Sequence, residues 1–178
     1  MMQRVKAFGL FVVAGLTLRV RRHVAYALFR FRLAPTPHDG FWLGQQLFPR
    51  FAQSHWRILD RLYYTIDAST IDRLLALWRK YELPTGKQRY AWLTRYTEAP
   101  RHYAPDFYDC DDFALDFTAW CRREFRINAV ALAFNAVHAF NVVVKAGGGV
   151  VLVEPQNGQI VKPAIEGLYG MNGAELLF

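Results

Sequence analysis

The sequence predicts an α+β domain in which a helix near the middle of the chain packs against an antiparallel β-sheet. Phe113, Phe117 and Trp120 recur at helical spacing after residue 110. Three short runs of β-branched and aromatic residues follow, separated by turn residues, at 129–134, 138–144 and 150–154. The chain of 178 residues is long enough to bury one sizeable core, and its 53% hydrophobic content excludes a disordered protein.

The first 34 residues are expected to form a separate helical arm that is both basic and apolar. Residues 1–32 contain seven Arg and Lys but no acid, and removing these seven from the 22 Lys and Arg leaves 15, which equals the 15 Asp and Glu. The net charge of +7 therefore belongs to the arm. Pro35 and Pro37 interrupt the helix and place the start of the domain, residues 35–178, at this point.

The arm favours an attachment role, and three alternatives remain open: a helix lying on anionic lipid, a segment docked on a partner, or a helix packed on its own domain. As a helix, the apolar run 7–18 would span about 18 Å, which is short of the roughly 30 Å of a bilayer core. A cleaved signal peptide is not expected, because the Arg-rich stretch 19–23 separates this run from a cleavage-like Ala-Tyr-Ala. Specific nucleic-acid binding is not expected, because the apolar side chains of the arm suit hydrocarbon better than phosphate.

Residues 69–83 are predicted to form an amphipathic helix that ends before Pro84. The apolar residues of this segment share one helical face: Ile71, Leu74, Leu75, Trp78 and Tyr81. Segment 90–107, which contains Pro100 and Pro105, is predicted to be a loop that leads into an acidic stretch.

That acidic stretch, YDCDDFA at 108–114, places Cys110 at the N-terminus of a helix predicted over about 111–125. Unpaired backbone donors and the helix dipole stabilise a thiolate at this position, whereas the neighbouring carboxylates oppose it. Position alone therefore leaves open whether Cys110 has a chemical role. Cys121 falls on the core-facing side of the same helix and is expected to pack there as an apolar residue.

The pairing register of the last two predicted strands decides whether a histidine meets an acid. His138 and Asn141 point to opposite faces of the sheet, so Asn141 is not expected to orient His138. A three-residue loop at 145–147 would place His138 directly opposite Glu154. A two-residue turn at 147–148 would instead place Asn141 opposite Glu154 and turn Glu154 to the other face. Both registers fit the sequence.

The segments YDCDDFAL, VHAFNVVV and VLVEPQ together resemble the transglutaminase-like branch of the papain-like cysteine peptidases. Bacterial transglutaminase-like cysteine peptidases and small phage or prophage proteins carry a similar series in the same order. The resemblance covers about 108–156. It implies a papain-like/transglutaminase-like core with extra N-terminal helices, in which Cys110 is the nucleophile, His138 the general base and Glu154 the acid that orients the histidine.

The function implied by this resemblance is that of a cysteine hydrolase, a thiol protease, peptidase or amidase that cleaves an amide bond in a protein, peptide or peptidoglycan-type substrate. The same residues would serve an acyltransferase. Gln156, Tyr108 and Asp111 are the candidates for binding the oxyanion or the substrate. The alternative is a catalytically inactive transglutaminase-like scaffold that acts as a structural, virion or membrane-associated binding protein through residues 1–34. The expected location is cytoplasmic or membrane-associated, including a place in a phage virion.

No cofactor is expected for this chemistry, with calcium as the open alternative. The resemblance implies calcium ligands beside the cysteine, where the acids are Asp109, Asp111 and Asp112. The favoured interpretation of the same acids is structural: Asp109 caps the helix, and Asp111 and Asp112 complement its dipole. The scattered histidines have no metal-ligand spacing, so no zinc site is expected.

Overall fold

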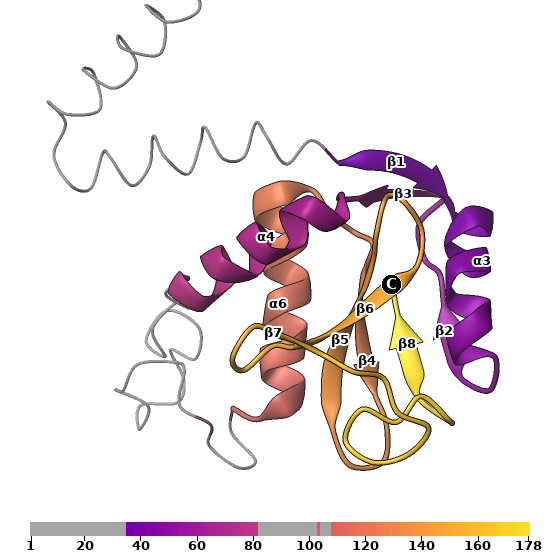
Figure 1. Cartoon of the computed structure of the whole chain (residues 1–178), viewed down its shortest axis with the longest axis vertical. Helices are drawn as coiled ribbons and strands as arrows, with labels where there is room; N and C mark the ends of the chain where they lie inside the picture. The colour runs from indigo at the N-terminus through magenta and orange to yellow at the C-terminus, as the bar shows by residue number, and fades with distance from the viewer. Residues whose placement is uncertain (1–34, 82–102, 104–107) are drawn as a thin grey trace, which may run out of the picture. The chain divides into compact units, whose positions relative to one another are not determined.

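The structure of the chain is a computed structural model, shown in Figure 1, and its described residues are 35–81, 103 and 108–178. The chain divides into two units, Met1–Ala34 and Pro35–Phe178, and all described elements belong to the second. The predicted arm and nearly all of the predicted loop 90–107 lie outside the described residues.

The first half of the described chain contains both helices and short strands, whereas the second half contains strands. The elements, in chain order, are β1 Thr36–Asp39, α3 Gly40–Phe51, β2 His55–Arg57, β3 Leu62–Thr65, α4 Ala68–Lys80, α6 Cys110–Phe125, β4 Val130–Phe134, β5 Ala139–Val144, β6 Val150–Glu154, β7 Gln159–Val161 and β8 Glu175–Leu177. In this part of the chain, no helix is long and apolar enough to cross a membrane.

The main sheet has six strands in the order β2-β8-β4-β5-β6-β7, and β1 pairs with β3 in a separate two-stranded sheet. Neighbouring strands of the main sheet are antiparallel except β2 and β8, which are parallel. The three strands predicted from the sequence are confirmed as β4, β5 and β6. The strands β2 and β8 were not predicted, because three residues are too few to show an alternating pattern.

The predicted fold class, a papain-like/transglutaminase-like core with a purely antiparallel sheet, is corrected by this arrangement. The described part of the chain is a sheet-rich domain with few helices, and β8 at its C-terminus lies between β2 and β4 in one mixed sheet. The prediction was wrong because it rested on the local series 108–156, which contains neither β2 nor β8. A short series of elements does not determine how the rest of the chain completes a sheet.

Different helices cover the two faces of the main sheet (Figure 1). On one face, the buried side of α3 joins residues of β5 and β6 in the main hydrophobic cluster, which includes Leu43, Leu47, Phe51, Phe140, Val142 and Leu152. The other face packs against α6, which contacts β4 and β5 and accepts hydrogen bonds from Asn141 of β5. Full burial of a large apolar side chain stabilises the fold by about 1.5–3 kcal/mol, so these two layers supply most of the stability.

Asn141 joins α6 to the sheet through a fully buried side-chain amide. Its Nδ2 donates to the Ala114 carbonyl at 2.9 Å, the Thr118 hydroxyl oxygen at 2.9 Å and the Ala131 carbonyl at 3.0 Å. This contact confirms the prediction that Asn141 points away from the face of His138.

The helix predicted to follow the acidic stretch is confirmed as α6, and its ends explain its limits. The Asp109 side chain accepts from the backbone of the first turn while the Asp112 side chain accepts from the Asp109 N–H, which forms a capping box. At the other end, Arg126 adopts the left-handed conformation at φ 59° and terminates the helix. Cys121 is fully buried, as predicted.

The amphipathic helix predicted at 69–83 is confirmed as α4, whose buried residues are Ile71, Leu74, Leu75 and Trp78. The Trp78 indole N–H donates to the Pro155 carbonyl at 2.7 Å. Because Pro155 follows the last residue of β6, this bond fixes the backbone beside Glu154.

The register of β5 and β6 differs from both predicted registers. Val142 pairs with Leu152 and Val144 with Val150, so continuation of the ladder places Phe140, rather than His138, level with Glu154. The turn places its left-handed residues at Gly148 and Gly149, with φ of 90° and 75°, one position later than expected. The ladder is displaced by two residues from the first predicted register, and an even displacement keeps each side chain on its face. Glu154 therefore stays on the face of His138.

Candidate functional site

Three element ends meet at one end of the main sheet: the start of α6, the start of β5 and the end of β6 (Figure 1). Because β5 and β6 are antiparallel, the start of one lies beside the end of the other. The α6 helix lies along β4 and β5. Its last residue is close to the start of β4, so its first residue lies at the other end of the sheet, where β4 ends and β5 starts. Cys110, His138 and Glu154 are thereby brought to the same end of the sheet.

Glu154 is the centre of a hydrogen-bonded cluster and is 6% exposed. Its Oε2 lies 2.7 Å from His138 Nε2 and accepts from the Tyr169 hydroxyl at 2.9 Å. Its Oε1 accepts from the Gln156 backbone N–H at 3.1 Å. Burial alone would raise the pKa of the Glu154 carboxyl, but the hydrogen bonds from His138, Gln156 and Tyr169 outweigh burial and hold this pKa below its ordinary value.

Tyr169 belongs to this cluster although sequence reasoning missed it. Burial and, next, the bond to Glu154 raise the pKa of the Tyr169 phenol to about 12. Its ring also packs edge-on against His138, with ring centroids 5.6 Å apart. No periodic pattern marks the glycine-containing segment around Tyr169, so only the folded structure shows that it reaches Glu154.

Replacing Glu154 with Gln should change how the free energy of unfolding depends on pH in the acid range. A carboxyl with a lowered folded pKa contributes stability that is fully present above its unfolded pKa, near 4.5, and is lost as pH falls through the folded pKa. We therefore expect the wild-type advantage in free energy of unfolding to be constant from about pH 7 to pH 5 and to shrink below about pH 4.5. Denaturant titrations at several pH values measure this difference. A difference independent of pH down to about pH 3 would contradict the assignment.

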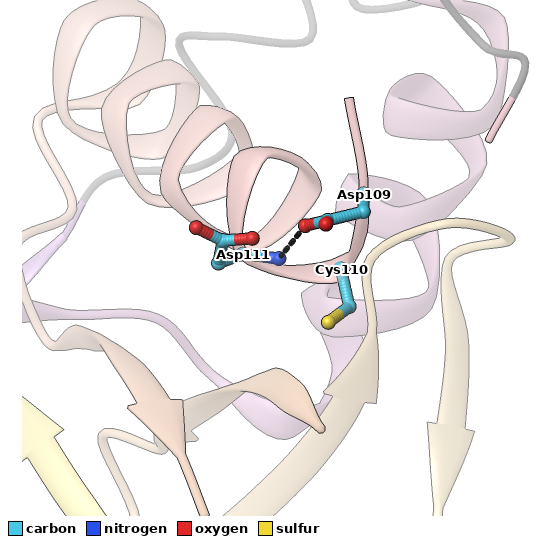
Figure 2. Close-up of side chains that lie close together, drawn as sticks. All are labelled: Asp109, Cys110 and Asp111. Atoms are coloured by element: carbon cyan, nitrogen blue, oxygen red, sulfur yellow. Dashed lines mark hydrogen bonds between the residues drawn. The ribbon is translucent and has the colours of Figure 1, made fainter. Parts of the chain in front are cut away.

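Cys110 occupies the first turn of α6 with an acid on either side, as Figure 2 shows. The Asp111 N–H donates to Asp109 Oδ1 at 3.4 Å, and the Cys110 Sγ and a carboxylate oxygen of each neighbour lie within 4.8 Å of one another. The hydrogen bond with Asp109 and, next, burial raise the pKa of Asp111. Within the described part of the chain, no hydrogen bond joins the Cys110 thiol to His138 or Glu154.

The structure thus brings two of the three predicted triad residues into direct contact and places the third at the same end of the sheet. Of the predicted oxyanion or substrate residues, Asp111 is exposed, and Gln156 contributes a backbone N–H to Glu154. Tyr108 is buried, and its hydroxyl donates to Asp116 at 2.6 Å, which gives it a contact inside the domain.

A second feature is an open groove along the outer face of α3, called here the α3 groove. Its volume is about 530 Å³, and its lining includes Phe41, Gly44, Gln45, Phe48, Trp56 and Ile58. Phe41 and Phe48 are 76% and 64% exposed. No charged side chain lines it among the described residues. Exposed aromatic residues gathered in a groove indicate an interaction site.

The amino-acid sequence contains a pattern that marks the α3 groove. Phe41, Gly44, Gln45 and Phe48 follow helical spacing, whereas the buried residues of the same helix are Leu43, Leu47 and Phe51. Two aromatic side chains, Phe41 and Phe48, therefore lie on the face of α3 that the core does not cover.

Residues 40–166 match the family model described as ricin-type beta-trefoil lectin C-terminal domain. The match covers more than half of the 178 residues, so the chain belongs to this lectin family. A comparison with curated proteins finds no match.

Two solved structures resemble the domain. The PSL1a–E64 complex has a TM-score of 0.50 and 20% sequence identity, with 80% of this chain and 50% of the other covered. The lectin of Polyporus squamosus, bound to the human-type influenza-binding epitope Neu5Aca2-6Galb1-4GlcNAc, has a TM-score of 0.51 and 21% identity, with 80% and 49% covered. At this identity the likeness shows the fold. The chain spans about half the length of each.

The family membership corrects the resemblance to transglutaminase-like and papain-like cysteine peptidases. The resemblance rested on about 108–156, whereas the family match extends over 40–166. The predictions of a cysteine hydrolase, of an enzyme, of a transglutaminase-like scaffold and of a protein, peptide or peptidoglycan-type amide partner are corrected with it, because the comparisons point to lectins. A cysteine at a helix start, a histidine and an acid are a local arrangement that does not by itself define a family.

Proposed function

We propose that this domain binds saccharides at the α3 groove. The observation that carries the proposal is the open groove with Phe41, Phe48 and Trp56 in its lining, in a chain that belongs to a lectin family. The saccharide bound to the Polyporus squamosus lectin supports the choice of ligand class.

The chemistry of the α3 groove fits a sugar ring. The C–H face of a pyranose is apolar and packs on aromatic rings, while its hydroxyl groups need a few hydrogen-bonding partners. The Gln45 side-chain amide offers both a donor and an acceptor at the groove. Gly44 adds no side chain beside Trp56, and a Cβ at this position would lie in ordinary van der Waals contact with the indole ring, at 3.6 Å.

Calorimetric titration of the full chain with Neu5Aca2-6Galb1-4GlcNAc as the probe tests the proposal. We expect weak saturable binding, with a dissociation constant on the order of 1 mM or about −4 kcal/mol, as suits an open groove. Because no charged side chain lines the groove, Galb1-4GlcNAc should bind within about threefold of the sialylated probe, a difference of under about 1 kcal/mol. The absence of saturable binding by both probes would contradict the proposal.

A second candidate is a small-ligand site at Cys110, His138 and Glu154, favoured by the 2.7 Å contact between His138 and Glu154. PSL1a, which resembles the domain in structure, was solved in complex with E64, and this complex supports a small ligand for the second candidate. Calcium on Asp109, Asp111 and Asp112 stays a prediction for the same region, to be tested by calorimetric titration with calcium chloride.

Thiol labelling tests the second candidate, with Cys121 as the internal control. Burial raises the pKa of the Cys121 thiol well above its ordinary value, so iodoacetamide should label Cys110 and leave Cys121 unmodified in the folded protein. If the imidazole acts on the thiol, His138→Ala should slow labelling of Cys110 by at least about tenfold. Prior incubation with E64 should protect Cys110. Equal labelling in wild type and His138→Ala, with no protection, would contradict this site.

A further inference from the structure

Asn135 lies in the turn between β4 and β5 and bonds two segments that are distant in sequence. Its Oδ1 accepts from the backbone N–H groups of Val137 and His138, both at 3.0 Å. Its Nδ2 donates to the carbonyls of Gly167, Leu168 and Gly170, each at 3.1 Å. One side-chain amide therefore holds the turn that carries His138 and the loop that carries Tyr169.

The loop with Tyr169, residues 164–171, is closed by its own backbone. The Ala164 N–H donates to the Tyr169 carbonyl and the Met171 N–H to the Ala164 carbonyl, both at 3.0 Å. Gly170 is tightly enclosed, because a Cβ there would lie 2.9 Å from the Glu166 backbone. A loop closed by its own backbone hydrogen bonds moves as one rigid segment. Hydrogen bonds to its carbonyls therefore also fix the position of the Tyr169 side chain.

The hydrogen bonds of Asn135, His138, Glu154 and the Tyr169 loop connect into one closed ring. Asn135 holds the turn of His138, His138 and Tyr169 both bond Glu154, and the backbone on either side of Tyr169 returns to Asn135. The Oδ1 bonds alone would be an ordinary asparagine turn. Three carbonyls from another segment around Nδ2 go beyond what such a turn requires.

We infer that Asn135 is the positioning residue of the Glu154 cluster, which makes loop 164–171 part of the site by holding the Tyr169 hydroxyl on Glu154. This inference goes beyond the proposed functions, because it concerns how the site is assembled and holds for any ligand. The two ends of the Asn135 amide have separate roles. The oxygen holds the backbone that carries His138, and the nitrogen holds the loop that carries Tyr169.

Substitutions that keep an acceptor oxygen but remove the Nδ2 group separate these two functions. In Asn135→Ser and Asn135→Asp an oxygen remains for the Val137 and His138 N–H groups, but the Nδ2 group that reaches the three loop carbonyls is removed. The Ser hydroxyl ends one atom short of the Nδ2 position, and the Asp carboxylate has no donor. We expect the pKa of Tyr169, measured by NMR, to fall from about 12 toward 10.0 in both variants. Amide exchange of Val137 and His138 should stay slow in both and become faster in Asn135→Ala. Gln53→Glu, on an exposed surface, is the control for added charge.

Two results would overturn the inference. The first is a Tyr169 pKa that stays at about 12 in folded Asn135→Ser. The second requires no variant: in the wild-type protein, the Asn135 side-chain amide protons should exchange more slowly than those of the exposed Asn172, and equal rates would show that Nδ2 holds nothing. If the thiol-labelling test fails but the pKa of Tyr169 is lowered in Asn135→Ser, the proposed small-ligand site at Cys110 is contradicted and the present inference still holds.

Discussion

Asn141→Asp should destabilise the domain by about 3–5 kcal/mol near neutral pH, because it leaves a buried charge without a partner. The nitrogen that now donates to Ala114, Thr118 and Ala131 would become an oxygen facing three oxygens. Burial would raise the pKa of the new carboxyl above its unfolded value of about 3.9. The penalty should therefore be full well above the folded pKa and diminish as pH falls below it.

Denaturant unfolding of the variant at several pH values measures this penalty. Asn172→Asp is the matched control, since Asn172 is exposed and the same substitution there should change the free energy of unfolding by no more than about 0.5 kcal/mol. Equal stability of the two variants would show that Asn141 does not join α6 to the sheet.

Replacing both Phe41 and Phe48 with Ala should abolish saccharide binding while leaving the fold intact. These rings are 76% and 64% exposed, so their removal costs little core packing. Each ring that contacts the sugar should contribute on the order of 1 kcal/mol, and losing two from a site of about −4 kcal/mol leaves no measurable affinity.

Phe134→Ala is the matched control for this pair. Phe134 is also exposed, at 39%, but lies on β4 outside the α3 groove. The control should bind the saccharide as the wild type does. If the double variant binds equally well, the sugar site lies elsewhere on the chain.

The parts of the fold that could be predicted from sequence are those with a local signal. The spacing of Phe113, Phe117 and Trp120 predicted α6, and the β-branched runs predicted β4, β5 and β6. The register was missed because consecutive glycines let the turn take its left-handed residues at either of two positions. The place of β8 between β2 and β4 depends on contacts between the two ends of the domain, which no local pattern contains.

The candidate sites divide in the same way. The contact between His138 and Glu154 was one of two alternatives that the sequence left open, and it forms in a third register, displaced by two residues, because side-chain alternation has period two. Tyr169 and Asn135 could not be found, since each reaches the cluster through a loop or turn. The family assignment failed for a related reason: the motif around Cys110 is local, whereas the lectin family match extends over 40–166.

The central claim, saccharide binding at the α3 groove, is tested most directly by following backbone amide and tryptophan indole NMR signals of the full chain during titration with Neu5Aca2-6Galb1-4GlcNAc. The account predicts saturable shifts at Phe41, Gln45 and Phe48 and at the Trp56 indole. Shifts confined to the residues around His138 and Glu154, or no shifts at all, would contradict it.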